Sequence, residues 1–169
     1  MRYLIILLCM MNWSIGNAAE FVLKSSAYAN NGRVPATYTC DSSNQRPPEL
    51  TWENPPPKTQ SFVLIYYTPD APWGTVYLWT VFNIPADTKK IPEGGVLPAT
   101  SIVGVSSRDE NIYRGPCPTD DKLHHYIYDL YALDTTMDEL DDTAVTEDIL
   151  SAIKPHILAK TQLESVYSH

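Results

Sequence analysis

The sequence predicts a mainly β protein: an antiparallel sandwich of short strands, with helix only near its end. Three observations lead to this. The 169 residues include 14 prolines, they contain many short runs of β-branched and aromatic residues, and the connections are rich in Pro, Asp and Gly. Proline interrupts helices, and short β-rich runs bounded by turn residues are typical of sandwiches rather than helical bundles.

Six runs are expected to be extended. The run over residues 61–68 is apolar without a break, which indicates a central strand buried on both faces of its sheet. Two more, over 76–84 and 125–133, are strong strand candidates because they are long and rich in aromatic and β-branched side chains. The six runs in chain order are 20–24, 34–39, 49–52, 61–68, 76–84 and 125–133.

Helix is expected only close to the C-terminal end. Residues 146–153 begin with a threonine suited to capping a helix, and two acidic residues follow in the first turn. Pro155 then interrupts the pattern, and residues 157–159 are predicted to resume as a second short helix. No internal repeat or heptad pattern is present in the sequence.

The first nineteen residues are predicted to be a secretory signal peptide. A short positive start is followed by an apolar run over 3–11, which is too short to span a bilayer, and then by small residues. Cleavage after Ala18 would place Gly16 and Ala18 at the two positions where small residues are preferred; the alternative is a retained membrane anchor. Residues 20–169 are then a single domain, periplasmic or secreted.

The chain is acidic, and this limits its partners. Arg2 is the one charged residue of the leader, so its removal takes the formal net charge from −8 to −9. Such a surface repels phosphate backbones and argues against nucleic-acid binding, although one small anion can still bind in a local pocket. No later segment is long and apolar enough to span a membrane.

Two cysteines remain after Cys9 leaves with the leader. In an oxidising compartment Cys40 and Cys117 are predicted to form one disulfide, and the alternative is two buried free thiols. A bond between them would close a long loop and stabilise the fold by about 4 kcal/mol in the chain-entropy model.

Three segments carry combinations of residues that are more distinctive than strand formation alone would need. They are residues 68–72, 77–85 and 113–118, and the last is followed by His124-His125-Tyr126. Because strand side chains alternate, His124 and Tyr126 share a face and His125 points the other way. A histidine beside a tyrosine hydroxyl, next to the stiff turn at 115–118, can hydrogen-bond a small anion. The alternative is that both are satisfied residues at the edge of the core.

These segments resemble the phosphatidylethanolamine-binding protein (PEBP) family, and in particular its bacterial Raf-kinase-inhibitor-like branch. The resemblance runs in order through nearly the whole mature chain, from Phe21-Val22-Leu23 to His156-Ile157-Leu158-Ala159. It implies two antiparallel sheets in a Greek-key, PEBP-like sandwich with short peripheral and C-terminal helices, and a small pocket for phosphate-like head groups. The pocket residues that carry over are Asp70, Pro72, Gly115, Pro116, His124 and Tyr126.

Two pocket positions depart from the family pattern. The family usually has Asp where this chain has Thr68, and usually His where this chain has Leu78. A charge-assisted hydrogen bond contributes roughly 1.5–3 kcal/mol, so each loss is expected to weaken binding of a phosphate or ammonium group about tenfold or more.

Catalysis and metal binding are not expected. No serine lies in a Gly-x-Ser-x-Gly turn or another recognisable nucleophile setting. Asp120-Asp121 with His124-His125 resembles a metal cluster on paper, but adjacent strand histidines point to opposite faces and cannot both reach one ion. The sequence therefore predicts no enzyme, no metal and no cofactor.

The leading hypothesis is an exported binding protein that holds a small anionic or phospho-head-group ligand at His124 and Tyr126. The alternative is an interaction protein that inhibits a protease or kinase-like partner through its pocket rim, with the small-ligand pocket reduced or lost. A third interpretation is a structural relic whose pocket Leu78 has closed. The sequence does not specify the oligomeric state.

Overall fold

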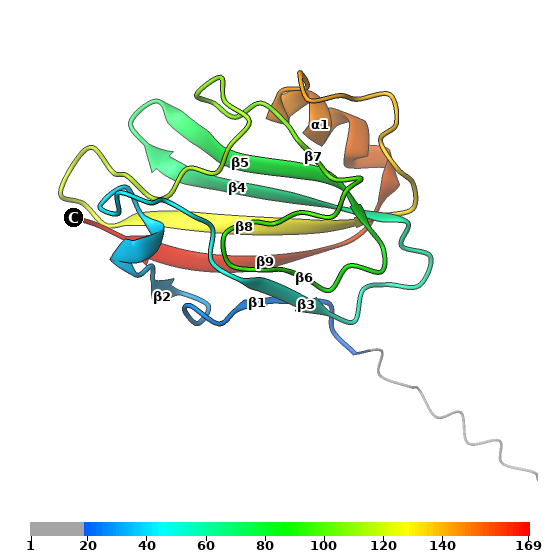
Figure 1. Cartoon of the computed structure of the whole chain (residues 1–169), viewed down its shortest axis with the longest axis horizontal. Helices are drawn as coiled ribbons and strands as arrows, with labels where there is room; N and C mark the ends of the chain where they lie inside the picture. Colours follow the sequence, from blue (N-terminus) through cyan, green and yellow to red (C-terminus); the bar gives the residue numbers. More distant parts are fainter. Residues whose placement is uncertain (1–18) are drawn as a thin grey trace, which may run out of the picture.

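The computed structural model describes residues 19–169 (Figure 1). The leader predicted over 1–19 therefore lies outside the described residues, apart from Ala19. No helix within residues 19–169 is long and apolar enough to cross a bilayer. Two sheets make up most of the structure.

The larger sheet has six strands and contains the three longest apolar runs of the sequence. Its strands are antiparallel neighbours except at one edge, where β2 pairs with β9 in parallel. In spatial order they are β2 (Gly32–Arg33), β9 (Ile157–Tyr167), β8 (His124–Leu133), β4 (Ser61–Ala71), β5 (Gly74–Pro85) and β7 (Ile102–Val103).

The smaller sheet is antiparallel and has three strands: β1 (Val22–Ser25), β3 (Leu50–Glu53) and β6 (Lys90–Ile91). Three short helical segments complete the fold: η1 (Ala36–Tyr38), α1 (Thr146–Ile153) and η2 (Lys154–His156). Figure 1 shows β1 and β3 along one side of the large sheet and α1 at another, near the ends of β4 and β5.

The two faces of the large sheet bury separate hydrophobic clusters. Even-numbered residues of β4 and β8, such as Tyr66 and Tyr128, pack with the small sheet, and these two rings stack with centroids 4.0 Å apart. Odd-numbered residues such as Ile65 and Leu133 pack with Ile149 of α1. This alternation follows from the two-residue period of a strand, and it explains why the central run is apolar at every position.

The predicted fold class is confirmed: two sheets, mainly β, with short helices. Strands form at five of the six predicted runs, and α1 has the predicted bounds. The prediction of an extended run over 34–39 is wrong, because residues 36–38 form a 3₁₀ turn after Pro35.

The second helix predicted over 157–159 is also wrong. These residues begin β9, which pairs with β8 along most of its length. The signal was present further on, since Leu163, Ser165 and Tyr167 point inward at every second position. The predicted cap is wrong too: Val145 is the N-cap, and the Thr146 hydroxyl lies 2.7 Å from that of Thr80 instead.

Candidate functional site

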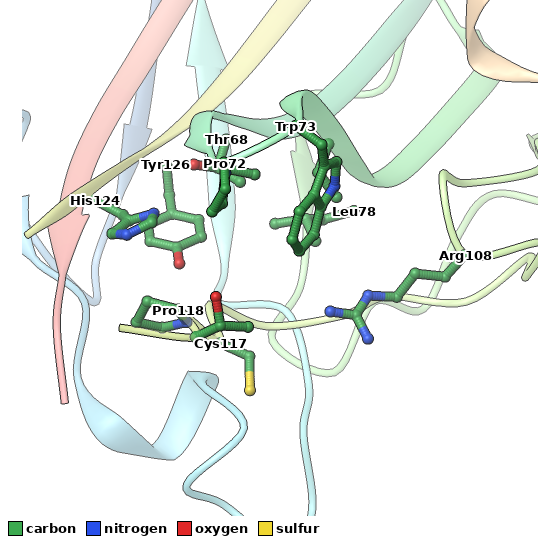
Figure 2. A pocket seen from close by; sticks show the side chains of 12 residues that line it. Thr68, Pro72, Trp73, Leu78, Arg108, Cys117, Pro118, His124 and Tyr126 are labelled. Atoms are coloured by element: carbon green, nitrogen blue, oxygen red, sulfur yellow. The ribbon is translucent and has the colours of Figure 1, made fainter. Parts of the chain in front are cut away.

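A small cavity of about 40 Å³ lies where β4 ends and β8 begins (Figure 2). Water occupies roughly 10–15 Å³ of such volume, so the space holds about three waters or one small oxyanion. The lining comes from the β4–β5 hairpin, the start of β8, residues 117–119 and the side chain of Arg108. The lining residues are Thr68, Ala71, Pro72, Trp73, Val76, Leu78, Arg108, Cys117, Pro118, Thr119, His124 and Tyr126.

The antiparallel pairing of β4 with β8 places the end of β4 beside the start of β8, and both line the cavity. Tyr67 lies opposite Ile127 in the antiparallel register, so Thr68 and Tyr126 are near neighbours on the same face. The hairpin turns tightly after Pro72 because Gly74 adopts φ +106°, a conformation that other residues rarely take. The turn carries Pro72 and Trp73 to the cavity.

His124 and Tyr126 both line the cavity, as strand alternation predicts. His124 is 5 % exposed, and its Nε2 lies 2.7 Å from Asp120 Oδ1. That hydrogen bond is the main cause of the lowered pKa of Asp120. Burial raises the pKa of Tyr126 to about 12, so its phenol stays protonated and can donate to a ligand.

The loop from Gly115 to Pro118 is held by contacts that leave little freedom. Cys117 forms a disulfide with Cys40 across 77 residues, with Cα atoms 5.4 Å apart. The Cys40 N–H donates to Pro116 O at 3.0 Å. A side chain on Gly115 would place its Cβ 2.2 Å from Tyr38 O, so only glycine fits there. The disulfide predicted from the sequence is present in the structure.

One positive side chain at the cavity was missed in the sequence. Arg108 lies in a loop between β7 and β8, and Figure 2 shows its guanidinium directed toward the space beside Trp73 and Cys117. Within residues 19–169, no carboxylate forms an ion pair with Arg108, and no Asp or Glu lines the cavity. The exposed Trp73 and Thr119 were also missed. No recognisable motif surrounds Arg108, so only the three-dimensional structure could reveal it.

Comparison with known proteins agrees with this geometry. The sequence profile of the family described as "Phosphatidylethanolamine-binding protein" matches residues 24–168. The chain belongs to this family.

Relatives of this PEBP-family chain extend over most of its length. A UPF0098 protein of Methanothermobacter thermautotrophicus is 40% identical over 149 residues, covering 86% of this chain and 97% of its own. The UPF0098 protein YbhB of Escherichia coli is 32% identical over 132 residues, covering 72% and 80%. The crystal structure of E. coli YbcL, titled a new member of the mammalian PEBP family, aligns with a TM-score of 0.83 at 28% identity, covering 89% and 99%.

A putative PEBP homologue from Chlamydia trachomatis aligns similarly, with a TM-score of 0.81 at 28% identity over 88% of this chain and 97% of its own. The two structural neighbours align with most of the present chain, so the fold that positions the cavity is the fold of the family.

The structure divides the predicted pocket residues into three groups. Pro72, His124 and Tyr126 line the cavity, whereas Gly115 and Pro116 lie behind it and shape the loop. Asp70 is not among the lining residues. Its carboxylate accepts hydrogen bonds from the His125 backbone N–H and ring Nδ1, both at 2.7 Å.

Asp70 lies outside the cavity because the pairing of β4 with β5 shifts register between Thr68 and Ala71. This shift breaks the alternation of side chains between the two faces of the sheet. Partial burial acts to raise the pKa of Asp70, but the hydrogen bonds and charge of His125 outweigh it and lower that pKa. Asp70 therefore ties the hairpin to the start of β8.

The two positions that depart from the family pattern both line the cavity. The Thr68 hydroxyl accepts a hydrogen bond from the Asp70 N–H at 3.3 Å, so part of its capacity is used within the turn. Leu78 is 4 % exposed and forms an apolar wall. The cavity thus combines one apolar side with Arg108, His124 and hydroxyl groups.

The two adjacent histidines point to opposite faces, as predicted: His124 contacts Asp120, whereas His125 contacts Asp70. One other group in the described part of the chain has the spacing of metal ligands: Cys40, Cys117 and His169. Its two sulfurs are bonded to each other, so they do not offer thiolates to an ion.

Proposed function

We propose that this chain is an exported, non-enzymatic binding protein whose cavity holds a small anion of the phosphate type, free or as the head group of a larger molecule. The observation that carries the proposal is the charge of the cavity. Arg108 and His124 line it from opposite sides, and within residues 19–169 no carboxylate lines it, since Asp120, which pairs with His124, is outside the lining.

The two groups suit an anion for different reasons. Arg108 presents a guanidinium, which pairs well with phosphate oxygens through parallel N–H bonds. The Nε2 of His124 is held by Asp120, which fixes the ring and leaves Nδ1 free to face a ligand; Nδ1 donates when the ring carries both protons. The Tyr126 hydroxyl adds a neutral donor.

The size of the cavity supports a small group. About 40 Å³ admits one oxyanion, and the remainder of a larger ligand would lie against Trp73 and Pro72 at the mouth. Leu78 stands where the family usually has a histidine, so this side of the cavity lacks an imidazole. We infer that Arg108 supplies the positive charge that Leu78 does not, so the pocket is altered rather than lost.

Export rests on the leader predicted over 1–19 and gains support from the disulfide, because such bonds persist in oxidising compartments. The absence of catalysis remains a prediction from the sequence. His124 has an acidic partner but no serine or cysteine thiol within the cavity lining to activate, since Cys117 is in the disulfide.

Thermal unfolding of the mature protein against increasing phosphate and phosphoethanolamine tests the proposal. A ligand at a hundred times its dissociation constant stabilises by roughly 2.7 kcal/mol, so a saturable rise in Tm is expected for the wild type and not for His124→Ala. Leu78→His, which restores the usual family residue, is expected to bind about tenfold more tightly. If neither the wild type nor Leu78→His responds to either compound, the anion pocket is excluded.

A second candidate function is a protein-interaction module, which inhibits a protease or kinase-like partner. The observation that favours it is Trp73, which is 72 % exposed at the tip of the β4–β5 hairpin, beside the cavity mouth. Exposed tryptophans are frequent anchors at interfaces. Inhibition of a partner that survives His124→Ala and is lost with Trp73→Ala would favour this function over ligand binding.

A further inference from the structure

A second cavity lies on the other face of the large sheet, on the side that α1 covers. Its volume is about 220 Å³, and β4, β5, β8 and α1 all contribute to it. Its lining includes three tyrosines and one acid: Ile65, Tyr67, Thr75, Tyr77, Asp129, Tyr131 and Leu150. Neither the family resemblance nor the phosphate pocket involves these residues.

The acid in this cavity is Asp129, a carboxylate in the middle of β8 that is only 4 % exposed. Its Oδ2 accepts a hydrogen bond from Tyr131 at 3.1 Å and pairs with the Lys160 ammonium at 2.8 Å. Its Oδ1 is buried and has no hydrogen-bond partner within residues 19–169. A buried carboxylate oxygen without a donor is unfavourable, so the Asp129 carboxylate gains from a further N–H donor that approaches when the Lys160 side chain moves aside.

The walls suit a positive charge. The rings of Tyr67 and Tyr77 lie 6.2 Å apart at 57°, and the Lys160 ammonium lies 5.6 Å from the centre of the Tyr131 ring. Aromatic faces attract ammonium groups over such distances. Burial, and after it the charge of Asp129, raises the pKa of Tyr67 to about 12, so this phenol is neutral and adds no competing charge.

Negative charge exceeds positive charge around the cavity. Glu164 helps to raise the pKa of Tyr67, and Glu147 helps to raise that of Tyr77, after burial in both cases. With Asp129 these make three carboxylates near the cavity; among residues 19–169, Asp129 pairs with Lys160, and Glu164 lies 3.9 Å from the His125 ring. The field at this cavity therefore favours a cation.

Lys160 indicates which kind of cation fits. Its side chain extends from β9, is 40 % exposed, and places a primary ammonium against both the carboxylate and an aromatic face. Because that side chain reaches solvent, it can move aside without disturbing the core. Its ammonium thus fills one hydrogen-bonding position of the carboxylate that lines the cavity.

We propose that this cavity is a binding site for small primary ammonium compounds, which take the place of the Lys160 ammonium against Asp129. The N–H groups of such a ligand reach the Asp129 carboxylate, and its carbon chain lies along the tyrosine side chains that line the cavity. The site is separate from the phosphate pocket, because Tyr67 and Asp129 face away from Thr68 and Tyr126.

The test uses n-butylammonium, which reproduces the lysine side chain, and 1-butanol as its neutral counterpart. Both are titrated at constant ionic strength while backbone amide resonances are followed by NMR. We expect saturable shifts centred on Tyr67, Tyr77 and Tyr131 with n-butylammonium, and binding of 1-butanol at least about tenfold weaker. Equal binding of the two compounds, or shifts centred elsewhere, would overturn the proposal.

Variants separate a ligand site from a simple ion pair. Lys160→Met removes the tethered cation, so n-butylammonium is expected to bind about tenfold more tightly and to raise the Tm of this variant more than that of the wild type. Tyr77→Leu, which keeps Asp129 and Lys160, is expected to weaken binding severalfold. Lys24→Met, which breaks an exposed Lys24–Glu53 ion pair at 3.2 Å, is the matched control and should leave affinity unchanged.

If Lys160→Met gains neither affinity nor stability from n-butylammonium, Lys160 and Asp129 form only a structural pair and the proposal is wrong. Asp129→Asn removes the carboxylate charge and is expected to abolish n-butylammonium binding; if this variant is too unstable to study, the Lys160→Met and Tyr77→Leu results decide alone. These outcomes do not depend on whether phosphate binds on the other face.

Discussion

The same strands of the large sheet line two cavities of opposite charge, one on each face. On β4 and β8, Thr68, His124 and Tyr126 face a cavity that receives the positive Arg108, whereas Tyr67, Asp129 and Tyr131 face a cavity with excess negative charge. Successive strand residues point to opposite faces, so one pair of strands can line two sites with little interference. The chemistry of each face is therefore set by alternate residues along the strands, not by contiguous segments.

The faces also differ in how they are held. The cavity at His124 depends on a covalent bond and on a loop that touches the backbone of Tyr38. The cavity at Asp129 is bounded in part by Leu150 of α1, and its acid pairs with the half-exposed Lys160 side chain. We therefore expect the first to be rigid and sensitive to changes in the loop, and the second to be adaptable.

Removing the disulfide should have the largest effect. The double change Cys40→Ser with Cys117→Ser opens a loop of 77 residues, and it is expected to lower the free energy of unfolding by about 4 kcal/mol. Urea unfolding measures this. Phosphate binding should weaken as well, while n-butylammonium binding should persist in the folded fraction; parallel loss of both would contradict the independence of the two faces.

A methyl group on Gly115 should have the next largest effect. Gly115→Ala places a Cβ 2.2 Å from Tyr38 O, a backbone atom that cannot move cheaply, so we expect a loss of about 3 kcal/mol. Gly104→Ala on the α1 side first meets the flexible end of Ile149, at 2.6 Å, and should cost only about 1 kcal/mol. Equal losses by urea unfolding would show that the loop is no more rigid than the α1 side.

Removing the charge of Arg108 should weaken phosphate binding about tenfold, since a charge-assisted hydrogen bond contributes roughly 1.5–3 kcal/mol. Isothermal titration of Arg108→Met with phosphate measures it. Lys154→Met is the matched control, because that side chain is exposed and lies outside the cavity lining. If the two variants lose the same affinity, Arg108 acts only through general charge.

The smallest effect concerns acid stability. The pKa of Asp70 is lowered from 3.8 in the folded state, so its contribution to stability is present well above pH 3.8 and is lost as the pH falls through the lower native value. Asp70→Asn should therefore be less stable than the wild type at neutral pH, and the difference should shrink in acid. A difference that is constant from pH 7 to pH 3 would contradict the role of the carboxylate.

Much of the fold was predictable, because its signals are local. The unbroken apolar run of β4 and the acidic start of α1 determine those elements directly. The end of the chain was mispredicted as helix because residues 157–159 carry no strand pattern of their own, and it is pairing with β8 that makes them extended. Tertiary contacts decided where local preference was weak.

The site was predictable in part for the same reason. Alternation placed His124 and Tyr126 together, and the family resemblance pointed to Pro72, Gly115 and Pro116. Arg108 reaches the cavity from a distant loop, and Asp70 turns away at a register shift, so neither position follows from spacing along the chain. Asp129 was not singled out because a lone acid in a strand has no motif.

The most direct test of the central claim is a phosphate titration of the ¹⁵N-labelled mature protein, followed residue by residue. We expect saturable shifts confined to the cavity of Arg108, Thr119, His124 and Tyr126, with Asp129 and Tyr131 unmoved. Shifts that never saturate, or that centre on Asp129, would contradict the assignment of the anion site to the His124 face.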